Sequence, residues 1–383
     1  MLNKDKEIIQ SIVQEVMVAQ KKQEEEKIPE RALEQPSTEK SPFGAEYGVT
    51  ENLETNTKLI KEWCKNSQLK IVDYYYGSVI QNKVSLFYLE DRVDTRTLEE
   101  VQNKMSNLEI DYLLHVETIG EELQHKSAGL FPTVRVSERF DVIVSDLIQG
   151  KVIIIADHCP LAVIAPVVFW GFFHQQDDYY TRTGRFTLRI LKILAFLFTI
   201  YGSTFFIVVQ KFHLDQIDNK KIYELFNGAD YILPALVQIL LIMLVMRMAI
   251  VNSVLVYSSY MILISLLVTM IIGEMSVKIN LLNPFIVVLM NLSILTSLHS
   301  LFKGLRPIIQ TLEPIMLFTG YFFDWWGVAI LSLIFFCWAS FLKPYGIHYL
   351  SPIIPLKVQD LKDTLWRGKL KKIINAKHTY REK

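Results

Sequence analysis

The sequence has little of what soluble enzymes, metalloproteins and nucleic-acid-binding proteins depend on. Its three cysteines, Cys64, Cys159 and Cys337, are scattered, which fits neither a disulfide framework nor a thiolate metal site. The chain contains no glycine-rich phosphate loop, no His-x-x-x-His pair and no Cys-x-x-Cys pair. Its 40 basic residues balance 40 acidic ones, so there is no net charge to attract nucleic acid.

Charged and apolar residues are separated along the chain. Apolar residues make up 51% and charged residues 21% of the sequence, and the mean hydropathy is +0.25. Residues 1–150 carry most of the charge, whereas 187–343 contain several apolar runs close to the ~20 residues that a bilayer requires. This pattern excludes a purely soluble enzyme and a purely disordered chain. We expect a membrane protein in which an N-terminal cytoplasmic α/β domain precedes an α-helical transmembrane bundle of four to six spans.

The first 42 residues are expected to form a charged amphipathic helix over 5–27 and a linker over 28–42. The helix would place apolar residues such as Ile8 and Ile12 on one stripe, and the linker holds three prolines among Glu, Ser and Thr. A frayed tail or a small coiled-coil contact explains this helix better than binding to a membrane surface does, because anionic lipid attracts Lys and Arg whereas the helix has an excess of Glu. Because Met1–Lys40 has no apolar core followed by small residues, we expect no signal peptide.

Residues 43–186 are expected to form the α/β domain. Apolar periodicity predicts two helices, over Asn52–Trp63 and Thr97–Leu108, and a third that Ser137 caps and Gly150 ends. Alternating or continuous apolar runs predict strands over Lys70–Tyr76, Lys83–Leu89 and Val152–Ala156.

Residues 187–343 are expected to form the transmembrane helical domain, followed by a basic cytoplasmic tail over 344–383. The expected spans are Leu191–Val209, Tyr231–Val251, Val254–Ile272, Pro284–Phe302 and a block over Ile308–Leu342, which is long enough to divide near Gly320 or at Asp324 and Gly327. The last 27 residues hold nine Lys or Arg and three Asp or Glu, so the positive-inside rule places them in the cytoplasm. Basic residues at 182, 185 and 189 place the α/β domain on the same side, which requires an even number of crossings.

No set of acid, base and nucleophile is visible, so we expect neither an enzyme nor a cofactor. His158 stands between Asp157 and Cys159, but three adjacent side chains cannot all converge on one ion, so no metal site is expected there.

Ionisable residues within the apolar half are more informative, because a charge at the bilayer centre is costly and usually faces other helices or water. Arg247 and Glu313 are candidates for a polar path or, equally, for pairing between helices. Glu274 and Lys278 are expected to form an ion pair at a helix end. Asp324 stands beside two tryptophans and is expected to lie in an interfacial turn. The uncharged residues expected to bond across helices are Asn252, Asn283 and Asn291.

Several stretches resemble the A subunits of GerA-type spore germinant receptors. The first are FGAEYGVTENLETNTKLIKEW (Phe43–Trp63) and LEIDYLLH (Leu108–His115). The longest matching stretch runs from Phe131 to Tyr180. It contains the motif FPT, the motif SERFD in place of the family's TERPD, an apolar strand followed by a turn, and the motif DDYY. GIHYLSPIIPLKVQDLKD (Gly346–Asp363) resembles the family's ending. The positions that match the family's motifs are Phe131, Pro132, Glu138, Arg139, Asp141, Gly150, Asp157, Pro160, Asp178, Tyr179, Tyr349, Pro352 and Asp360.

The sequence also departs from the family's pattern. The family usually has a further soluble lobe before the equivalent of Phe43, so we expect a divergent member lacking that first N-terminal lobe. Phe140 stands where the family has Pro, and His158 stands where it has Gly. The segment Val237–Met248 has Arg247 as its one charged residue, where the family's helix carries several acidic ones, and the arginines expected near Glu313 are missing.

The resemblance implies an oligomeric A subunit in the inner membrane of the spore, which forms or gates an ion-release path. Its expected partners are further copies of itself, a multi-span B-type subunit that binds the nutrient and a lipoprotein C-type subunit, with no nucleic acid. An accessory or degenerate paralogue that supports germination complexes without conducting is the alternative. A secondary transporter fits less well, because Pro234, Pro284 and Pro314 do not divide the chain into paired halves.

Overall fold

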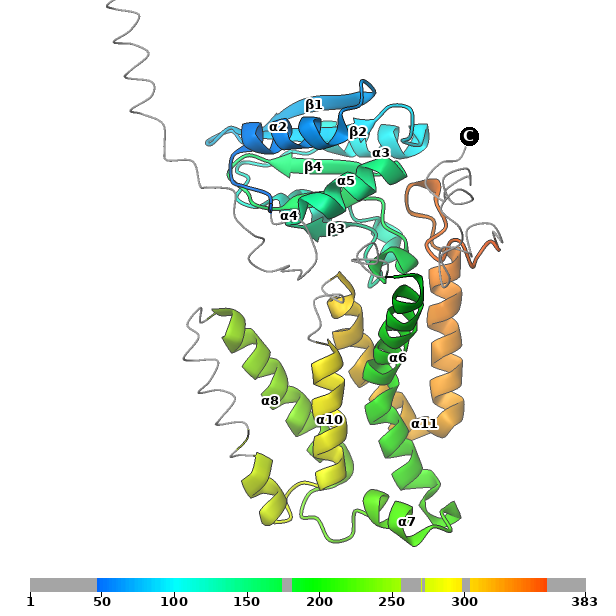
Figure 1. The fold of residues 1–383 in the computed structure, drawn as a ribbon. Coiled ribbons are helices and arrows are strands. Elements are labelled where there is room, and N and C mark those ends of the chain that lie inside the picture. The colour runs from blue at the N-terminus through cyan, green and yellow to red at the C-terminus, as the bar shows by residue number, and fades with distance from the viewer. Residues whose placement is uncertain (1–46, 174–180, 256–269, 271–272, 298–303, 357–383) are drawn as a thin grey trace, which may run out of the picture.

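The computed structural model describes residues 47–173, 181–255, 270, 273–297 and 304–356. An α/β region occupies the first of these ranges, and the remainder is helical (Figure 1). Several predictions lie outside the described residues. They are the helix over 5–27, the linker over 28–42, Asp178 and Tyr179, most of the span Val254–Ile272, and the tail from residue 357 with Asp360.

The α/β region contains one antiparallel five-stranded sheet with the strand order β1-β2-β4-β5-β3. Its strands are β1 (Leu69–Tyr76), β2 (Asn82–Leu89), β3 (Arg135–Ser137), β4 (Val152–Ala156) and β5 (Ala162–Ala165). Every residue of β4 and β5 is buried, which confirms a strand at 152–156 that is covered on both faces. The edge strand β1 lies farthest from the helical part, and β3 lies nearest to it (Figure 1).

Helices cover both faces of this sheet. On one face lie α2 (Leu53–Cys64) and α5 (Phe140–Gln149), whose apolar residues share a core with Ile153 and Ile155. On the other face lie α3 (Thr95–Ser106) and α4 (Val116–Leu123), which share a second core with Ile154. The short 3-10 helices η1 (Lys126–Ala128) and η2 (Phe169–Phe172) lead toward the helical part.

The start of α5 differs from the prediction. Ser137 is the last residue of β3, and its hydroxyl accepts a hydrogen bond from the Arg139 amide at 3.3 Å, so Ser137 does not cap the helix. Arg139 occupies the N-cap position, and Phe140 is the first helical residue. The predicted end is confirmed, because Gly150 adopts a left-handed conformation with φ of 94° directly after the helix.

The helical part contains α6 (Arg182–Phe212), α7 (Lys220–Phe226), α8 (Ala235–Leu255), α10 (Pro284–Ser297) and α11 (Arg306–Phe341), with the 3-10 helices η4 (Leu214–Gln216) and η6 (Pro344–Gly346). Among the described residues, two helices are long and apolar enough to cross a membrane, Thr183–Phe212 and Arg306–Phe341. Two shorter apolar helices span Ala235–Met248 and Pro284–Thr296. Because α6 begins at Arg182, the predicted domain boundary at residue 187 falls inside a helix.

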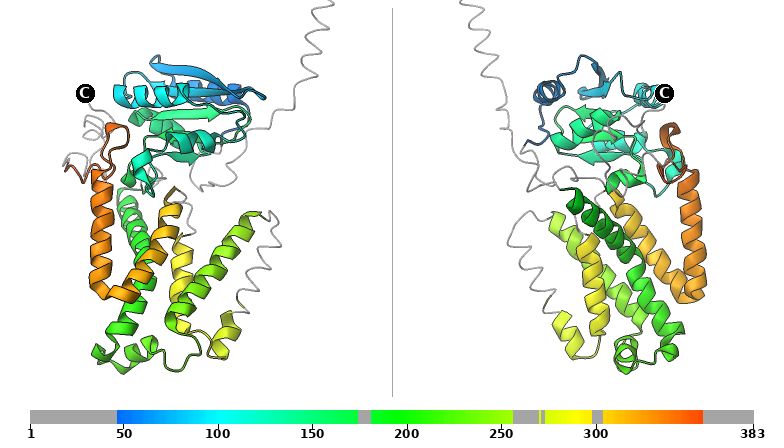
Figure 2. Two further views of the ribbon diagram at one scale, coloured as in Figure 1. Left: turned by 180° about the vertical axis from the view of Figure 1, so that it is seen from behind. Right: turned by 45° about the vertical axis from the view of Figure 1, so that its right-hand side comes forward.

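Helix α11 is a hairpin rather than one straight helix. Asp324 has φ of 57° and ψ of −161°, which interrupts the helix and divides it into two arms. The first arm runs away from the α/β region and the second returns to it, in each view (Figures 1 and 2). At 1.5 Å per residue each arm is roughly 26 Å long, close to the ~30 Å hydrocarbon core of a bilayer.

The division at Asp324 confirms one of the two predicted break points, whereas Gly320 has a different role. A Cβ atom on Gly320 would lie 2.6 Å from Thr204 Cγ2 and 2.9 Å from Val208 Cγ2, both on α6. Glycine therefore lets the first arm of α11 approach α6 closely, as small residues do between membrane helices.

Candidate functional site

The predicted candidates Arg247 and Glu313 meet between α8 and the first arm of α11. An Arg247 Nη2 atom lies 3.9 Å from a Glu313 carboxylate oxygen and donates a hydrogen bond to the Gln310 carbonyl oxygen at 2.7 Å. The Glu313 side chain is 11% exposed and that of Arg247 39% exposed. The structure thus places both residues in one contact between helices, which is one of the two roles that the sequence left open.

Pro314 explains why Arg247 bonds a backbone carbonyl. A proline has no N–H group, so Pro314 leaves the carbonyl four residues earlier, that of Gln310, without its helical donor. In an apolar surrounding such a carbonyl must find another partner, and Arg247 provides one. Sequence reasoning missed this link, although the spacing of Gln310 and Pro314 was there to indicate it.

A small cavity adjoins this contact. Its polar lining comes from four helices, and the residues are Thr199, Arg247, Ser293, Arg306, Gln310 and Glu313. The Thr199 hydroxyl also lies 2.7 Å from that of Thr296, which joins α6 to α10 at the same level. The cavity measures about 40 Å³, enough for water or a small ion but far below the ~300 Å³ of an ordinary organic-ligand pocket.

The other predicted polar residues of the helical part have separate surroundings. Among the described residues, Asn291 donates to the Val287 carbonyl of its own helix at 2.8 Å, and its bond to another helix stays a prediction. Asn283 does bridge elements, because it donates to the Leu225 carbonyl at 3.1 Å and its amide donates to Gln238 at 2.7 Å. The side chain of Asn252 lies outside the described residues.

Two predicted charged residues also have defined partners. Glu274 accepts from Lys278 at 2.6 Å in an exposed pair, as predicted. Asp324 lies at the break of α11, and its carboxylate oxygen is 2.9 Å from the His213 ring, a partner that sequence reasoning did not find. None of these contacts adjoins the Arg247 site.

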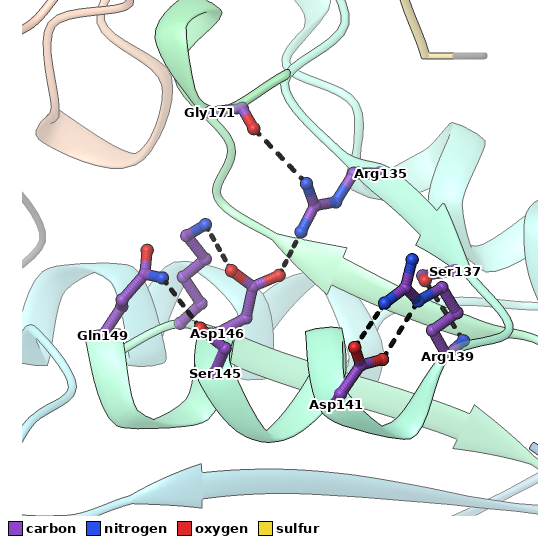
Figure 3. Close-up of polar contacts among 9 residues, drawn as sticks. Arg135, Ser137, Arg139, Asp141, Ser145, Asp146, Gln149 and Gly171 are labelled. Atoms are coloured by element: carbon purple, nitrogen blue, oxygen red, sulfur yellow. Dashed lines mark hydrogen bonds and ion pairs between the residues drawn. The ribbon is translucent and has the colours of Figure 1, made fainter. Parts of the chain in front are cut away.

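In the α/β region, the SERFD motif lies beside a buried ionic cluster (Figure 3). Asp146 of α5 is paired with Arg135 of β3 and, at 2.7 Å, with Lys151, and all three side chains are at most 5% exposed. Burial alone would raise the pKa of Asp146, but the adjacent Arg135 and Lys151 charges outweigh it and hold that pKa below its usual range. Arg135 also donates to the Gly171 carbonyl at 3.4 Å, which ties the cluster to η2 just before α6.

The motif residues themselves surround the start of α5. Arg139 is bonded to Asp141 through two nitrogens, one of them Nε at 3.0 Å, and Glu138 is buried beside them. Because Arg139 and Asp141 span the N-cap and the first turn, their pair fixes the entry into the helix (Figure 3). Sequence reasoning selected these residues by resemblance but missed Arg135, Asp146 and Lys151, whose opposite charges inside apolar segments were the available signal.

Asp157 helps to hold the start of α2. Its carboxylate accepts a hydrogen bond from the Leu53 amide at 3.1 Å, at the start of α2. His158 is 72% exposed, whereas Cys159 is buried and burial raises the pKa of its thiol. Within the part of the chain that the structure describes, no group of three His, Cys, Asp or Glu side chains could hold a metal. The half-buried Pro160 follows in the same turn.

The remaining motif positions join the α/β region to the second arm of α11. The Phe131 ring lies 5.2 Å from that of Trp338 and 5.6 Å from that of Tyr349. Trp338 donates to the Ser127 carbonyl at 3.3 Å, and a Cβ on Gly129 would come within 2.7 Å of its ring. Pro132 follows Phe131 directly, and Pro352 is buried in the turn after Tyr349. The motifs FPT and HYLSP, far apart in sequence, thus form one junction.

A family model described as Bacillus/Clostridium GerA spore germination protein matches residues 6–379. Spore germination protein KA of Bacillus subtilis (strain 168) is 27% identical over 343 residues, which cover 88% of this chain and 62% of that protein. The uncharacterized membrane protein YfkQ of the same organism is 24% identical over 340 residues, covering 88% of this chain and 66% of that protein. This chain therefore spans less than two thirds of the length of either relative.

A solved structure is also similar in sequence. It is the crystal structure of the N-terminal domain of the A subunit of the Bacillus megaterium spore germinant receptor GerK3, which is 27% identical and covers 32% of this chain and 97% of that one. The TM-score is 0.26, below the level at which two folds can be compared.

Proposed function

The chain belongs to the GerA family of Bacillus and Clostridium spore germination proteins, and from this premise we propose that it is an A-type subunit of a germinant receptor. We place its helical part in the inner membrane of the spore, with the α/β region and the C-terminal tail in the cytoplasm. Its proposed partners are further copies of itself, a multi-span B-type subunit and a lipoprotein C-type subunit. The proposed role is not catalytic.

The proposed mechanism is an ion-release path through the helical part. The observation that carries it is the contact of Arg247 with Glu313 and the Gln310 carbonyl, beside a cavity where hydroxyl and charged groups lie among apolar side chains such as Met243 and Met290. Charges in such surroundings are costly and usually serve a polar path or a pairing between helices. A cavity of this size suits water or an ion, which is consistent with nutrient binding by another subunit.

Opening would require the contact to exchange partners. Arg247 joins α8 to the first arm of α11, so a movement of α8 relative to α11 must break or replace its two bonds. We propose that nutrient binding elsewhere in the receptor favours a second arrangement of these helices, in which the polar lining becomes continuous. The total number of crossings in this proposal is even, because both ends of the helical part face the α/β region.

Ion release from spores tests the proposal. Potassium release after nutrient addition is measured in strains that carry the parent gene, a deletion, Arg247→Leu, Glu313→Gln or Asn291→Ala. We expect the deletion to slow release and the Arg247 and Glu313 variants to change its rate at equal protein level. Asn291→Ala is the matched control, because Asn291 is a polar residue of the same helices that bonds only its own helix among the described residues.

Two results would count against this function. Release at the parent rate from deletion spores, for every nutrient tested, would remove the chain from the receptor pathway. If the deletion slows potassium release but Arg247→Leu spores release potassium at the parent rate, the second candidate is favoured. That candidate is the accessory paralogue, which supports other subunits without conducting. The low number of charges in α8, where Arg247 is alone within Val237–Met248, is the observation that favours this second candidate.

A further inference from the structure

The end of the helical part farthest from the α/β region holds a cluster that the ion path does not use. There the C-terminus of α6, η4 and the break of α11 come together (Figure 1). We call residues 321–326 the hairpin tip. Most of its aromatic side chains are exposed, including Phe323 at 68% and Trp326 at 78%, whereas the Trp325 ring lies 5.7 Å from the Phe205 ring of α6.

Lys211 makes the first of two polar contacts with the tip. Its ammonium donates to the Tyr321 carbonyl at 2.6 Å and lies 3.6 Å from the centre of the Tyr321 ring. Carbonyls in the last turn of a helix lack intrahelical donors, and Asp324 ends the first arm just beyond Tyr321. Lys211 therefore satisfies a free carbonyl at the negative end of the helix dipole.

His213 makes the second contact and can change its charge. Its Nε2 atom lies 2.9 Å from an Asp324 carboxylate oxygen, and its Nδ1 atom lies 3.3 Å from Oε1 of Gln216. A carboxylate and an amide oxygen only accept hydrogen bonds, and a neutral imidazole has one N–H to donate, whereas an imidazolium has two. The ring thus faces acceptors on both sides, an arrangement that suits the protonated form.

We propose that His213 is a protonation-dependent latch that fastens the hairpin tip to α6, tight when the ring is protonated and looser when it is neutral. Histidine is the side chain that most readily changes its charge between pH 5 and 8. Loss of the proton removes one donor and the attraction to Asp324, so the latch weakens as the pH rises.

The charges around His213 come from each element at this end. Asp324 of α11 faces the ring directly, Lys211 lies two residues earlier at the end of α6, and Asp215 follows in η4. Helix α7 brings Lys220, Lys221 and Glu224 to the same end of the bundle (Figure 1). Within this mixed set, Asp324 is the acidic group in contact with the ring, so it sets the direction of the pH effect.

The latch joins α6 and α11, the two helices that connect to the α/β region, at their ends far from that region. Helix α6 follows η2, and the second arm of α11 ends at the Trp338 junction. Loosening the tip would let the two arms separate from α6 at their far end, while the junction near the α/β region stays intact. This inference does not depend on whether the chain conducts ions.

Amide hydrogen exchange in the full chain in lipid nanodiscs tests the proposal. Exchange of peptides covering the tip is measured at about pH 5.5 and about pH 8, on either side of the imidazole titration, after correction for the intrinsic rate. Because hydrogen bonds to charged groups are worth about twice those between neutral groups, we expect the parent tip to lose protection roughly five- to tenfold at the higher pH.

Variants separate protonation from contact. His213→Gln can still donate to Asp324 but cannot titrate, so its tip should exchange alike at both pH values. The matched control, His158→Gln, removes an exposed histidine of the α/β region and should behave like the parent. Protection of α5 peptides reports whether each variant is folded. A parent tip with the same protection at both pH values refutes the latch, whatever the variants do. A His213→Gln variant with the parent's pH dependence also refutes it.

Discussion

Replacing Asp146 by Asn should strongly destabilise the α/β region, because it removes the acid from a buried cluster and leaves two cations. Arg135 and Lys151 would then be left facing a neutral side chain, in a site where each is at most 5% exposed. Breaking a buried ion pair by removing one partner typically costs 3–5 kcal/mol. We therefore expect the free energy of unfolding to fall by about 3–5 kcal/mol.

Hydrogen exchange in the full chain measures this loss locally. At ~1.4 kcal/mol per tenfold change, amides of α5 and β4 should exchange on the order of 10²- to 10³-fold faster in Asp146→Asn. The matched control is Asp73→Asn, which breaks the pair with Lys83 at 2.8 Å, where the two side chains are 38% and 40% exposed. An exposed pair contributes about 0–1 kcal/mol, so exchange in the control should change at most severalfold.

The pH dependence of stability tests the same cluster independently, because its direction follows from the lowered pKa of Asp146. The pKa of Asp146 is held below its usual range, so the folded chain keeps this carboxylate ionised at pH values where the unfolded chain takes up a proton. Its contribution is complete above about pH 4, the ordinary Asp range, and is lost as the pH falls through the depressed value. Asp146→Asn should lack this part of the acid sensitivity. If Asp146→Asn differs from the parent by less than about 1 kcal/mol, Asp146 is not the buried partner of two cations.

Three further substitutions test other contacts. Gly320→Ala would bring a Cβ within 2.6 Å of Thr204, so we expect a loss of about 1–3 kcal/mol in thermal unfolding, whereas Gly273→Ala, with no atom within 4 Å, should be neutral. Trp338→Ala should expose the junction with Phe131 to proteolysis. Trp326→Ala is the control and should not, because the Trp326 side chain is 78% exposed. Phe140→Pro suits the first helical position but removes a fully buried ring. It should lose about 3–5 kcal/mol, as should Phe140→Ala, and a much larger loss for Pro would show that the backbone rejects it.

Local patterns in the sequence predicted several elements of the α/β region closely but missed α4 and β3. The periodicity near residues 53–64 and the paired runs at 69–76 and 82–89 depend on neighbouring residues, and each predicted element is within about two residues of the observed one. The start of α5 was misplaced, because Ser137 is a plausible cap by residue type. Its place in β3 depends on pairing with Ala162, which is distant in sequence.

The contacts between helices could not be predicted in the same way. Arg247 and Glu313 stood out because charges are rare in apolar segments, but the bond to the Gln310 carbonyl depends on how α8 lies against α11. The same holds for His213 and Asp324, which are 111 residues apart and lie in segments that look interfacial when read separately. Sequence indicated which residues are unusual, whereas the path of the chain decides which of them meet.

The division of the core shows where movement is easiest. One apolar cluster joins the α/β region to α6 and α11 through residues such as Phe131, Ile200 and Ile308, and its members in the described part of the chain do not include α8 or α10. Helices α8 and α10 contribute Ile242 and Met290 to a second cluster, which also includes Phe206 of α6 and Leu317 of α11. A domain core resists deformation because it is closely packed, so the α/β region and the adjoining parts of α6 and α11 are expected to move as one body, against which α8 and α10 can shift.

Movement between these two bodies must then exchange the contacts that cross from one to the other. In the half of the helical part nearer the α/β region these include two polar contacts, the Thr199 hydroxyl with that of Thr296, and Arg247 with Gln310 and Glu313. A polar contact can be replaced by water at low cost, whereas an apolar contact cannot, so we expect this boundary to open more easily at these polar contacts than at the apolar cluster around Phe206 and Leu317. Arg247→Leu should therefore hinder opening more than it affects folding, which is why ion release is the appropriate measurement for that variant.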